Sequence, residues 1–107
     1  MKNKVVKRTI SEMRAYRERL VTGNFSALML FGEAYQIVIK QEIVDALARL
    51  AEEDKLQKFI WEWLDSKSEV LEYLYQLMIY SDYSFSTEFM DVLQKEVERD
   101  REVHAYE

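Results

Sequence analysis

The stretch LQKFIWEWL, residues 56–64, decides the fold class of this 107-residue chain. Its large apolar side chains stand at positions 56, 59, 60, 63 and 64, which is the i, i+3, i+4, i+7, i+8 spacing of an amphipathic α-helix. The acidic run EED at residues 52–54 suits the start of that helix, where the helix dipole favours carboxylates. We therefore predict a helix that contributes Trp63 to a hydrophobic core.

Trp61 belongs to the same stretch but falls outside the apolar stripe when the residues are placed at 100° intervals. Two interpretations are open for it. Either an adjoining helix covers the ring, or the ring is an exposed anchor for a protein partner, a role in which tryptophan is enriched. On the second interpretation, Trp61→Ala would weaken partner binding and leave the fold nearly intact, whereas Trp63→Ala would destabilise the fold.

The segment before this stretch predicts a long second helix, over about residues 26–50, with an unusual pattern. The apolar face of residues 27–39, which includes Phe31, Ala34, Tyr35 and Val38, points roughly opposite that of residues 43–51. The change falls at Lys40 to Glu42. Either the helix breaks there, or a continuous central helix packs against different neighbours along its two halves. We favour the continuous helix.

The segment after this stretch predicts two more helices. Ser66 and Glu69 form a capping box ahead of a fourth helix at about residues 67–80, and the small polar residues that follow predict a loop before a last helix. No segment shows the period of two that is typical of strands. The predicted fold class is therefore all-α: a compact bundle of about five helices with a long central second helix, in one domain over residues 1–107.

The composition is that of a folded globular domain, because 49% of the residues are apolar and 33% are charged. Cysteine is absent, which excludes disulfides, thiolate metal sites and cysteine nucleophiles and requires no oxidising compartment. No window approaches the roughly 20 apolar residues of a membrane span, and the N-terminus has no signal-peptide core. We expect a cytoplasmic protein with no membrane partner.

Charge is divided unevenly along the chain. Residues 4–21 predict a first helix, ended by a left-handed turn at Gly23. Residues 1–21 carry seven basic and two acidic side chains, whereas residues 22–107 carry a net charge of −10. The basic face of this helix consists of Lys4, Lys7, Arg8 and Arg14. The acidic body can neutralise that face, or the face can contact nucleic acid. The −10 body argues against nucleic acid, because it repels phosphates.

The residues that would support catalysis or a cofactor are missing from the pattern. His104 is the only histidine and has no spaced partner for a zinc site, and Gly23 and Gly32 belong to no phosphate-binding loop. Paired carboxylates occur, but they are explained by solvated helix ends. We expect no enzyme activity, no catalytic residue, no metal and no cofactor.

An aromatic set near the fourth helix is the second candidate for binding a partner. Tyrosine combines an apolar ring with a hydroxyl that prefers a polar contact, which suits an interface beside an acidic surface. Tyr73 is expected in the core, and Tyr80, Tyr83 and Phe85 are expected to be exposed. With Trp61, the predicted partner-binding residues are Trp61, Tyr75, Tyr80, Tyr83 and Phe85.

The segment AYQIVIKQEI, residues 34–43, resembles a small helical domain family of unknown function from mobile and accessory genes of anaerobic gut bacteria. The likeness extends to YLY at 73–75 and to FMDVL at 89–93, over about two thirds of the chain. The proline that often opens the family's second helix is absent here, and residues 80–86 look inserted. The family assigns no active site that could be carried over.

The resemblance implies a biological setting. Small acidic proteins of phages and mobile elements often inhibit host nucleic-acid defences stoichiometrically, as anti-CRISPR proteins do. We therefore expect a non-catalytic protein-binding module that occupies a basic surface of its partner, where charge speeds encounter and aromatic anchors slow dissociation. The alternatives are a regulator that contacts DNA through the basic first helix and a homodimeric scaffold protein.

Overall fold

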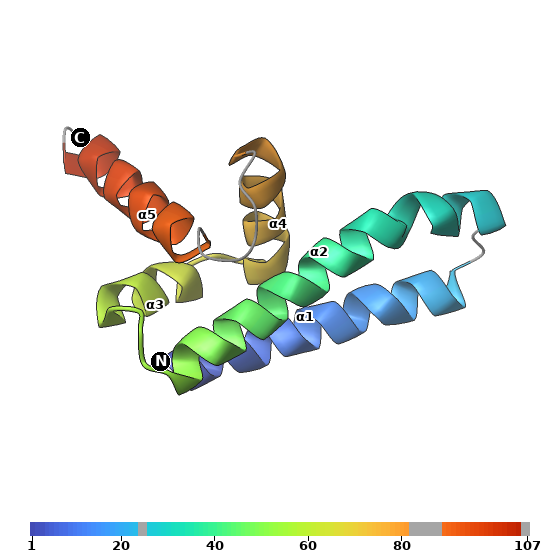
Figure 1. Ribbon diagram of the computed structural model, residues 1–107, viewed down its shortest axis with the longest axis horizontal. Coiled ribbons are helices and arrows are strands. Elements are labelled where there is room, and N and C mark those ends of the chain that lie inside the picture. Colours follow the sequence, from blue (N-terminus) through green and yellow to red (C-terminus); the bar gives the residue numbers. More distant parts are fainter. Residues whose placement is uncertain (24–25, 82–88, 106–107) are drawn as a thin grey trace.

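The computed structural model describes residues 1–23, 26–81 and 89–105, and within them it contains five α-helices and no β-strand (Figure 1). The helices are α1 (Lys2–Thr22), α2 (Ala27–Glu52), α3 (Lys58–Asp65), α4 (Val70–Ser81) and α5 (Phe89–Ala105). The predicted all-α fold class is confirmed, and so is the long second helix of 26 residues.

The helices are arranged as a long hairpin with three shorter helices over one of its ends (Figure 1). α1 and α2 run antiparallel, and α1 also packs against α3 and α4. α5 packs against α3. The half of the hairpin that holds the end of α1 and the start of α2 therefore projects away from the other helices.

α2 is continuous through Lys40 to Glu42, as predicted, but only its second half is enclosed. Ile43 and Leu47 are fully buried in the hydrophobic core. The apolar face of the first half is exposed instead of packing on a second set of neighbours, so this part of the prediction was wrong. Of the described helices, α4 packs against α2 near Lys40 and α3 and α5 lie toward the other half, so the outer side of the first half stays exposed.

The turns on either side of α2 differ from the prediction. Gly23 has φ −70° and ψ 154°, so α1 ends in an extended residue and not in a left-handed turn. The run at residues 52–54 ends α2 instead of starting α3, because Asp54 takes the left-handed conformation with φ 54°. The amide of Lys55 then donates to Leu50 O at 3.1 Å, which satisfies a carbonyl at the end of the helix.

α4 starts at Val70, and its first amides are bound by a side chain from α1. Glu12 accepts hydrogen bonds from Val70 N through Oε1 at 2.9 Å and from Leu71 N through Oε2 at 3.3 Å. A carboxylate at this position satisfies amides that have no partner within the helix and interacts favourably with its dipole. The start of α4 is thus capped by a tertiary contact, whereas the predicted capping box placed it three residues earlier.

α3 lies between α1 and α5, and this arrangement determines the surroundings of Trp61 and Trp63. Asp65, one turn after Trp61 and on the same side of the helix, pairs with α1, so Trp61 faces α1. Trp61 is only 2% exposed, which contradicts its prediction as an exposed anchor and supports the alternative of a covering helix. Trp63 is half-buried on the side facing α5, where its Nε1 donates to Asp100 Oδ2 at 3.0 Å.

Candidate protein-binding site

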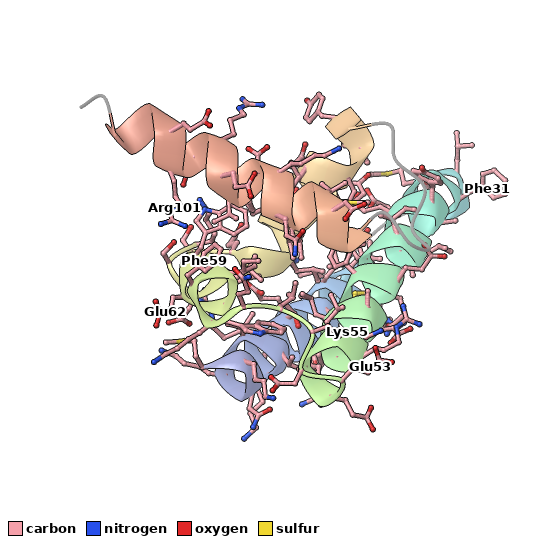
Figure 2. The ribbon with its side chains drawn as sticks, turned by 60° about the vertical axis from the view of Figure 1, so that its left-hand side comes forward. Phe31, Glu53, Lys55, Phe59, Glu62 and Arg101 are labelled. Carbon is pink, nitrogen blue, oxygen red and sulfur yellow. The ribbon has the colours of Figure 1, made fainter. Side chains whose placement is uncertain are left out.

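Four apolar side chains on the projecting half of α2 form a row on its outer side. Leu28, Phe31, Tyr35 and Val38 alternate at spacings of three and four residues, and they are between 54% and 82% exposed. This spacing repeats every seven residues, as in the seam of a coiled coil, and it places all four on one side of the helix. We call this row the α2 stripe. Figure 2 shows Phe31 pointing away from the rest of the molecule.

The backbone of this region is a regular helix that begins with an N-cap residue. Ser26 is extended, and its side chain accepts a hydrogen bond from Met29 N at 3.3 Å, as an N-cap residue does. Gly32 and Ala34 flank the stripe and are exposed. A Cβ atom at Gly32 would meet nothing within 4 Å. The surface beside the stripe is therefore flat, and another helix can approach it closely.

Polar contacts on the opposite side of α2 fix the direction in which the stripe points. Tyr16 of α1 donates a hydrogen bond to Glu33 Oε2. Gln36 donates to the same carboxylate oxygen at 2.9 Å and accepts from Lys40 Nζ at 2.9 Å. Burial and the hydrogen bond to Glu33 raise the pKa of Tyr16 well above its usual value. The hydrogen bond from Tyr16 holds the Glu33 side of α2 against α1, so the stripe stays on the outside.

Lys40 is the centre of these contacts and is buried where α1, α2 and α4 meet. Its Nζ lies 2.8 Å from Glu72 Oε2, 3.9 Å from the ring centre of Tyr16 and 5.4 Å from that of Tyr75. Burial by itself would raise the pKa of Glu72, but the hydrogen bonds from Lys40 and Gln76 lower it below its usual value. Lys40 therefore stays paired and surrounded by aromatic rings, and it joins α2 to α4.

A groove runs between α1 and α2 over the middle of the hairpin. Its charged edges come from Arg14, Arg17, Glu18 and Asp45. Ile10 and Val21 of α1 line the groove and are exposed, and Val21 is 84% exposed. Apolar surface is thus present on α1 as well as on the α2 stripe.

Two of the four side chains of the predicted basic face of α1, Lys4 and Arg8, are paired within the molecule. Arg8 lies 3.1 Å from Asp65 Oδ1 and also donates to the carbonyl oxygens of Asp65, Lys67 and Ser68. Lys4 lies 3.2 Å from Asp65 Oδ2, and its hydrogen bond, followed by that of Arg8, lowers the pKa of Asp65 despite some desolvation. These pairs support the interpretation that the acidic body neutralises the basic helix.

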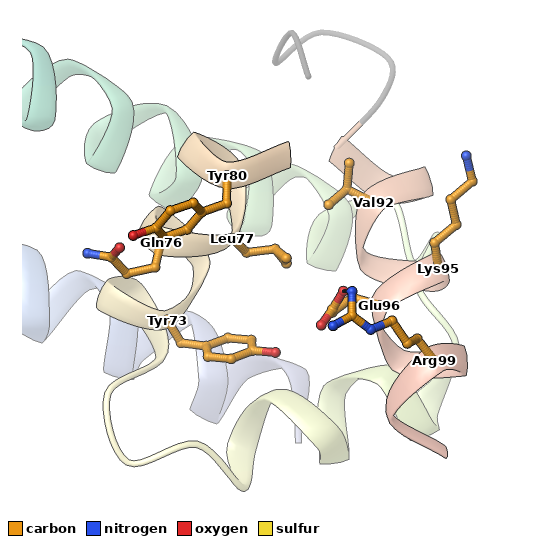
Figure 3. Close-up of a pocket in the computed structure, with 8 residues that line it drawn as sticks. All are labelled: Tyr73, Gln76, Leu77, Tyr80, Val92, Lys95, Glu96 and Arg99. Atoms are coloured by element: carbon orange, nitrogen blue, oxygen red, sulfur yellow. Dashed lines mark ion pairs between the residues drawn. The ribbon is translucent and has the colours of Figure 1, made fainter. Parts of the chain in front are cut away.

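A second groove lies between α4 and α5 (Figure 3). Its lining is mixed: Tyr73 and Tyr80 come from α4, and Glu96 and Arg99, which lie 3.9 Å apart, come from α5. Tyr80 is 83% exposed, so its predicted exposure is confirmed. Tyr73 is half-buried, with its ring edge-on to that of Trp63 at 5.7 Å between centres.

The five predicted partner-binding residues are not brought together. Trp61 is in the core, Tyr75 is half-buried beside Lys40, and Tyr80 is exposed on α4. Tyr83 and Phe85 lie outside the described residues. The α2 stripe was visible in the sequence as an apolar face, but it was interpreted as core. Its seven-residue repeat and the absence of charges beside it were the signals for a different interpretation.

No group of three or more histidine, cysteine, aspartate or glutamate side chains suited to a metal ion occurs among the described residues. Within the same residues, none of the helices combines the length and the apolar character needed to cross a membrane. Comparison of the chain with protein-family models, with curated proteins and with solved structures finds no match in any of the three.

Proposed function

We propose that this protein is a non-catalytic protein-binding module and that the α2 stripe is its binding face. The observation that carries the proposal is the exposure of Leu28, Phe31, Tyr35 and Val38 in one row on a helix whose other side is half-buried and hydrogen-bonded to α1. Contiguous apolar surface of more than a few hundred Å² is uncommon on soluble proteins and marks interaction sites. A helix with anchors at this spacing is a recurring mode of recognition between proteins.

The aromatic rings give the stripe most of its binding energy in this proposal. An aromatic side chain buries about 150 to 250 Å² when it is covered, so Phe31 and Tyr35 offer the largest areas. Both are rigid, and each loses little conformational freedom on binding. We therefore expect Phe31 to be the residue at which a single substitution weakens partner binding most.

The test compares two exposed aromatic residues on different helices. The variants are Phe31→Asp and Tyr80→Asp, and the wild-type residues are 80% and 83% exposed. Each is immobilised and used to capture proteins from a lysate of the host cell. A captured protein that is lost with Phe31→Asp and retained with Tyr80→Asp supports the stripe. Retention with both variants refutes the stripe as the binding face, and loss with Tyr80→Asp alone assigns binding to the groove between α4 and α5.

The proposed setting is inhibition of a host nucleic-acid-handling defence protein, in the manner of an anti-CRISPR protein. Two observations support it: the resemblance through residues 34–43 and the charge of −10 on residues 22–107. Trp61 does not support this setting, because its side chain is buried and cannot contact a partner. An acidic body beside an apolar stripe suits a partner whose basic surface surrounds an apolar patch. Repeating the capture over a range of salt concentrations tests the charge contribution, which salt should weaken.

Binding to DNA through α1 is the less favoured alternative. Lys4 and Arg8 are paired with Asp65, whereas Lys7 and Arg14 are exposed and form no ion pair within the described residues. Two cations give a shallow dependence of affinity on salt, because each neutralised phosphate contributes about one unit of slope. A steep slope in a DNA titration, abolished by Lys7→Ala together with Arg14→Ala, would favour the regulator instead.

A further inference from the structure

We infer that the α2 stripe pairs with the α2 stripe of a second copy of this chain, antiparallel and about a two-fold axis that passes between Phe31 and Tyr35. The inference rests on the proposed function and names a partner for the same binding face, a second copy of the chain, which the experiments below distinguish from a captured host protein. In this pairing Phe31 faces Tyr35 of the second copy, and Leu28 faces Val38 of the second copy. The observations that carry it are the charges, the small flanking residues and the apolar area of the stripe.

The charges around the stripe favour a partner with the same surface. Glu33 is the only charged residue from 27 to 39, and it points inward to Tyr16. A second copy therefore meets no like charge along the stripe. A partner that carries charges in the contact itself would instead find no opposite charge to pair with along the stripe.

The direction of the pairing follows from Glu42. It is exposed and continues the row four residues after Val38. In a parallel pair, Glu42 would lie beside Glu42 of the second copy, and like charges in contact disfavour the pair. In the antiparallel pair, it lies beyond the start of the other α2, which begins at Ala27. The antiparallel arrangement also opposes the two helix dipoles favourably.

The shape of the molecule leaves room for the second copy. The half of the hairpin that carries the stripe projects from the side where α3, α4 and α5 gather (Figure 1). Gly32 and Ala34 flank the stripe with little or no side chain, so the two helix backbones can approach to about 8 to 10 Å.

The area at stake is sufficient for a specific dimer of modest affinity. Two stripes with their flanks remove on the order of 1,000 Å² from water, close to the lower limit for stable interfaces. Each of the two symmetric contacts between Phe31 and Tyr35 adds an aromatic pair. We expect a dimer that forms and dissociates in the micromolar range.

The first experiment measures mass by sedimentation over a range of concentrations. The wild-type chain should reach twice its mass of 12.9 kDa at about 100 μM. Phe31→Asp should raise the dimer dissociation constant at least about 100-fold, because it places an unpaired carboxylate in an apolar contact. Tyr80→Asp, at an equally exposed position on α4, should leave the dimer dissociation constant unchanged. The helix content measured by circular dichroism should be the same in the wild type and in both variants.

The second experiment reads the direction of the pair with single cysteines, which is straightforward because the chain has none of its own. Ala34→Cys lies near the proposed axis and should cross-link to itself with a short bis-maleimide. Leu28→Cys should not, because antiparallel pairing separates the two copies of residue 28 by the length of the stripe. Efficient cross-linking through Leu28→Cys would overturn the antiparallel pairing.

Failure of this inference can be distinguished from failure of the proposed function. A wild-type chain that remains monomeric up to about 1 mM, while Phe31→Asp loses a captured partner, overturns the second copy and retains the binding face. A wild-type dimer that is unaffected by Phe31→Asp, together with unchanged capture, overturns both.

Discussion

The ammonium group of Lys40 is buried 2.8 Å from a carboxylate oxygen of Glu72, which joins the middle of α2 to the first turn of α4. A buried cation is costly unless it is paired, and Lys40 also has Gln36 and the rings of Tyr16 and Tyr75 around it. Removing only the carboxylate of Glu72 should therefore destabilise this junction more than replacing the buried charge of Lys40 by an apolar side chain.

We expect Glu72→Ala to lower the free energy of unfolding by about 1.5 to 3 kcal/mol, because it leaves the Lys40 ammonium without its carboxylate. Lys40→Met should cost less, since a flexible apolar side chain of similar length removes the charge that needs a partner. Urea denaturation of both single variants and of the double variant measures the coupling. A Lys40→Met variant less stable than Glu72→Ala would contradict the expectation.

The two tryptophans should respond in the opposite order to the one that their sequence pattern predicts. Trp61→Ala empties a site that is 2% exposed and should cost about 3 to 5 kcal/mol. Trp63→Ala should cost less, because the ring is half-buried, although it also loses the hydrogen bond to Asp100. Thermal or urea unfolding decides the order.

Trp61→Phe is the informative control for this pair. Nε1 of Trp61 is buried and has no acceptor within the described part of the chain. Removing such an unpaired donor offsets part of the lost packing. The phenylalanine variant should therefore recover most of the stability that the alanine variant loses, and a loss as large as that of alanine would contradict this.

Glu12→Ala should destabilise the protein by about 1 to 2 kcal/mol, because the carboxylate accepts from the amides of Val70 and Leu71 at the start of α4. Glu18→Ala, on the exposed side of the same helix, is the matched control and should change the stability by less than about 0.5 kcal/mol. Equal effects in chemical denaturation would show that the cap contributes nothing.

Acid should destabilise the protein through Asp65 and Glu72. Both have pKa values below their usual range in the folded state, so each contributes stability that is complete above its unfolded pKa. That contribution is lost as the pH falls below about 4 and through the folded pKa values. The dependence of stability on pH between pH 7 and pH 2 should be flatter for Asp65→Asn than for the wild type.

Asp54→Gly should raise the stability by up to about 1 kcal/mol, because residue 54 has φ 54° and glycine adopts this conformation without strain. The substitution also removes the exposed ion pair with Lys2, which contributes little. Glu53→Gly, where φ is −82°, should destabilise the protein instead. A thermal melt of each variant against the wild type tests the difference in sign.

Much of the fold could be predicted from the chain because each helix carries its own apolar periodicity. Trp61 shows the limit of predicting from periodicity, because its burial depends on α1. The contact between α3 and α1 includes Asp65, which pairs with Arg8, 57 positions away in the sequence. The cap of α4 was missed for the same reason, since Glu12 is remote from Val70 in sequence. The α2 stripe was recognised as apolar, but periodicity does not tell whether a neighbour covers an apolar face.

The shortness of α3 determines when it can form. Eight residues are fewer than the roughly 12 to 15 that an isolated helix needs to be stable in water, so α3 owes its shape to α1 on one side and α5 on the other. The hairpin of α1 and α2 is made of long helices that are neighbours in sequence, and contacts of that kind close quickly. During folding we therefore expect the hairpin of α1 and α2 to form first. The turns of α3 that carry the two tryptophans should become helical last, once α5 has packed against them.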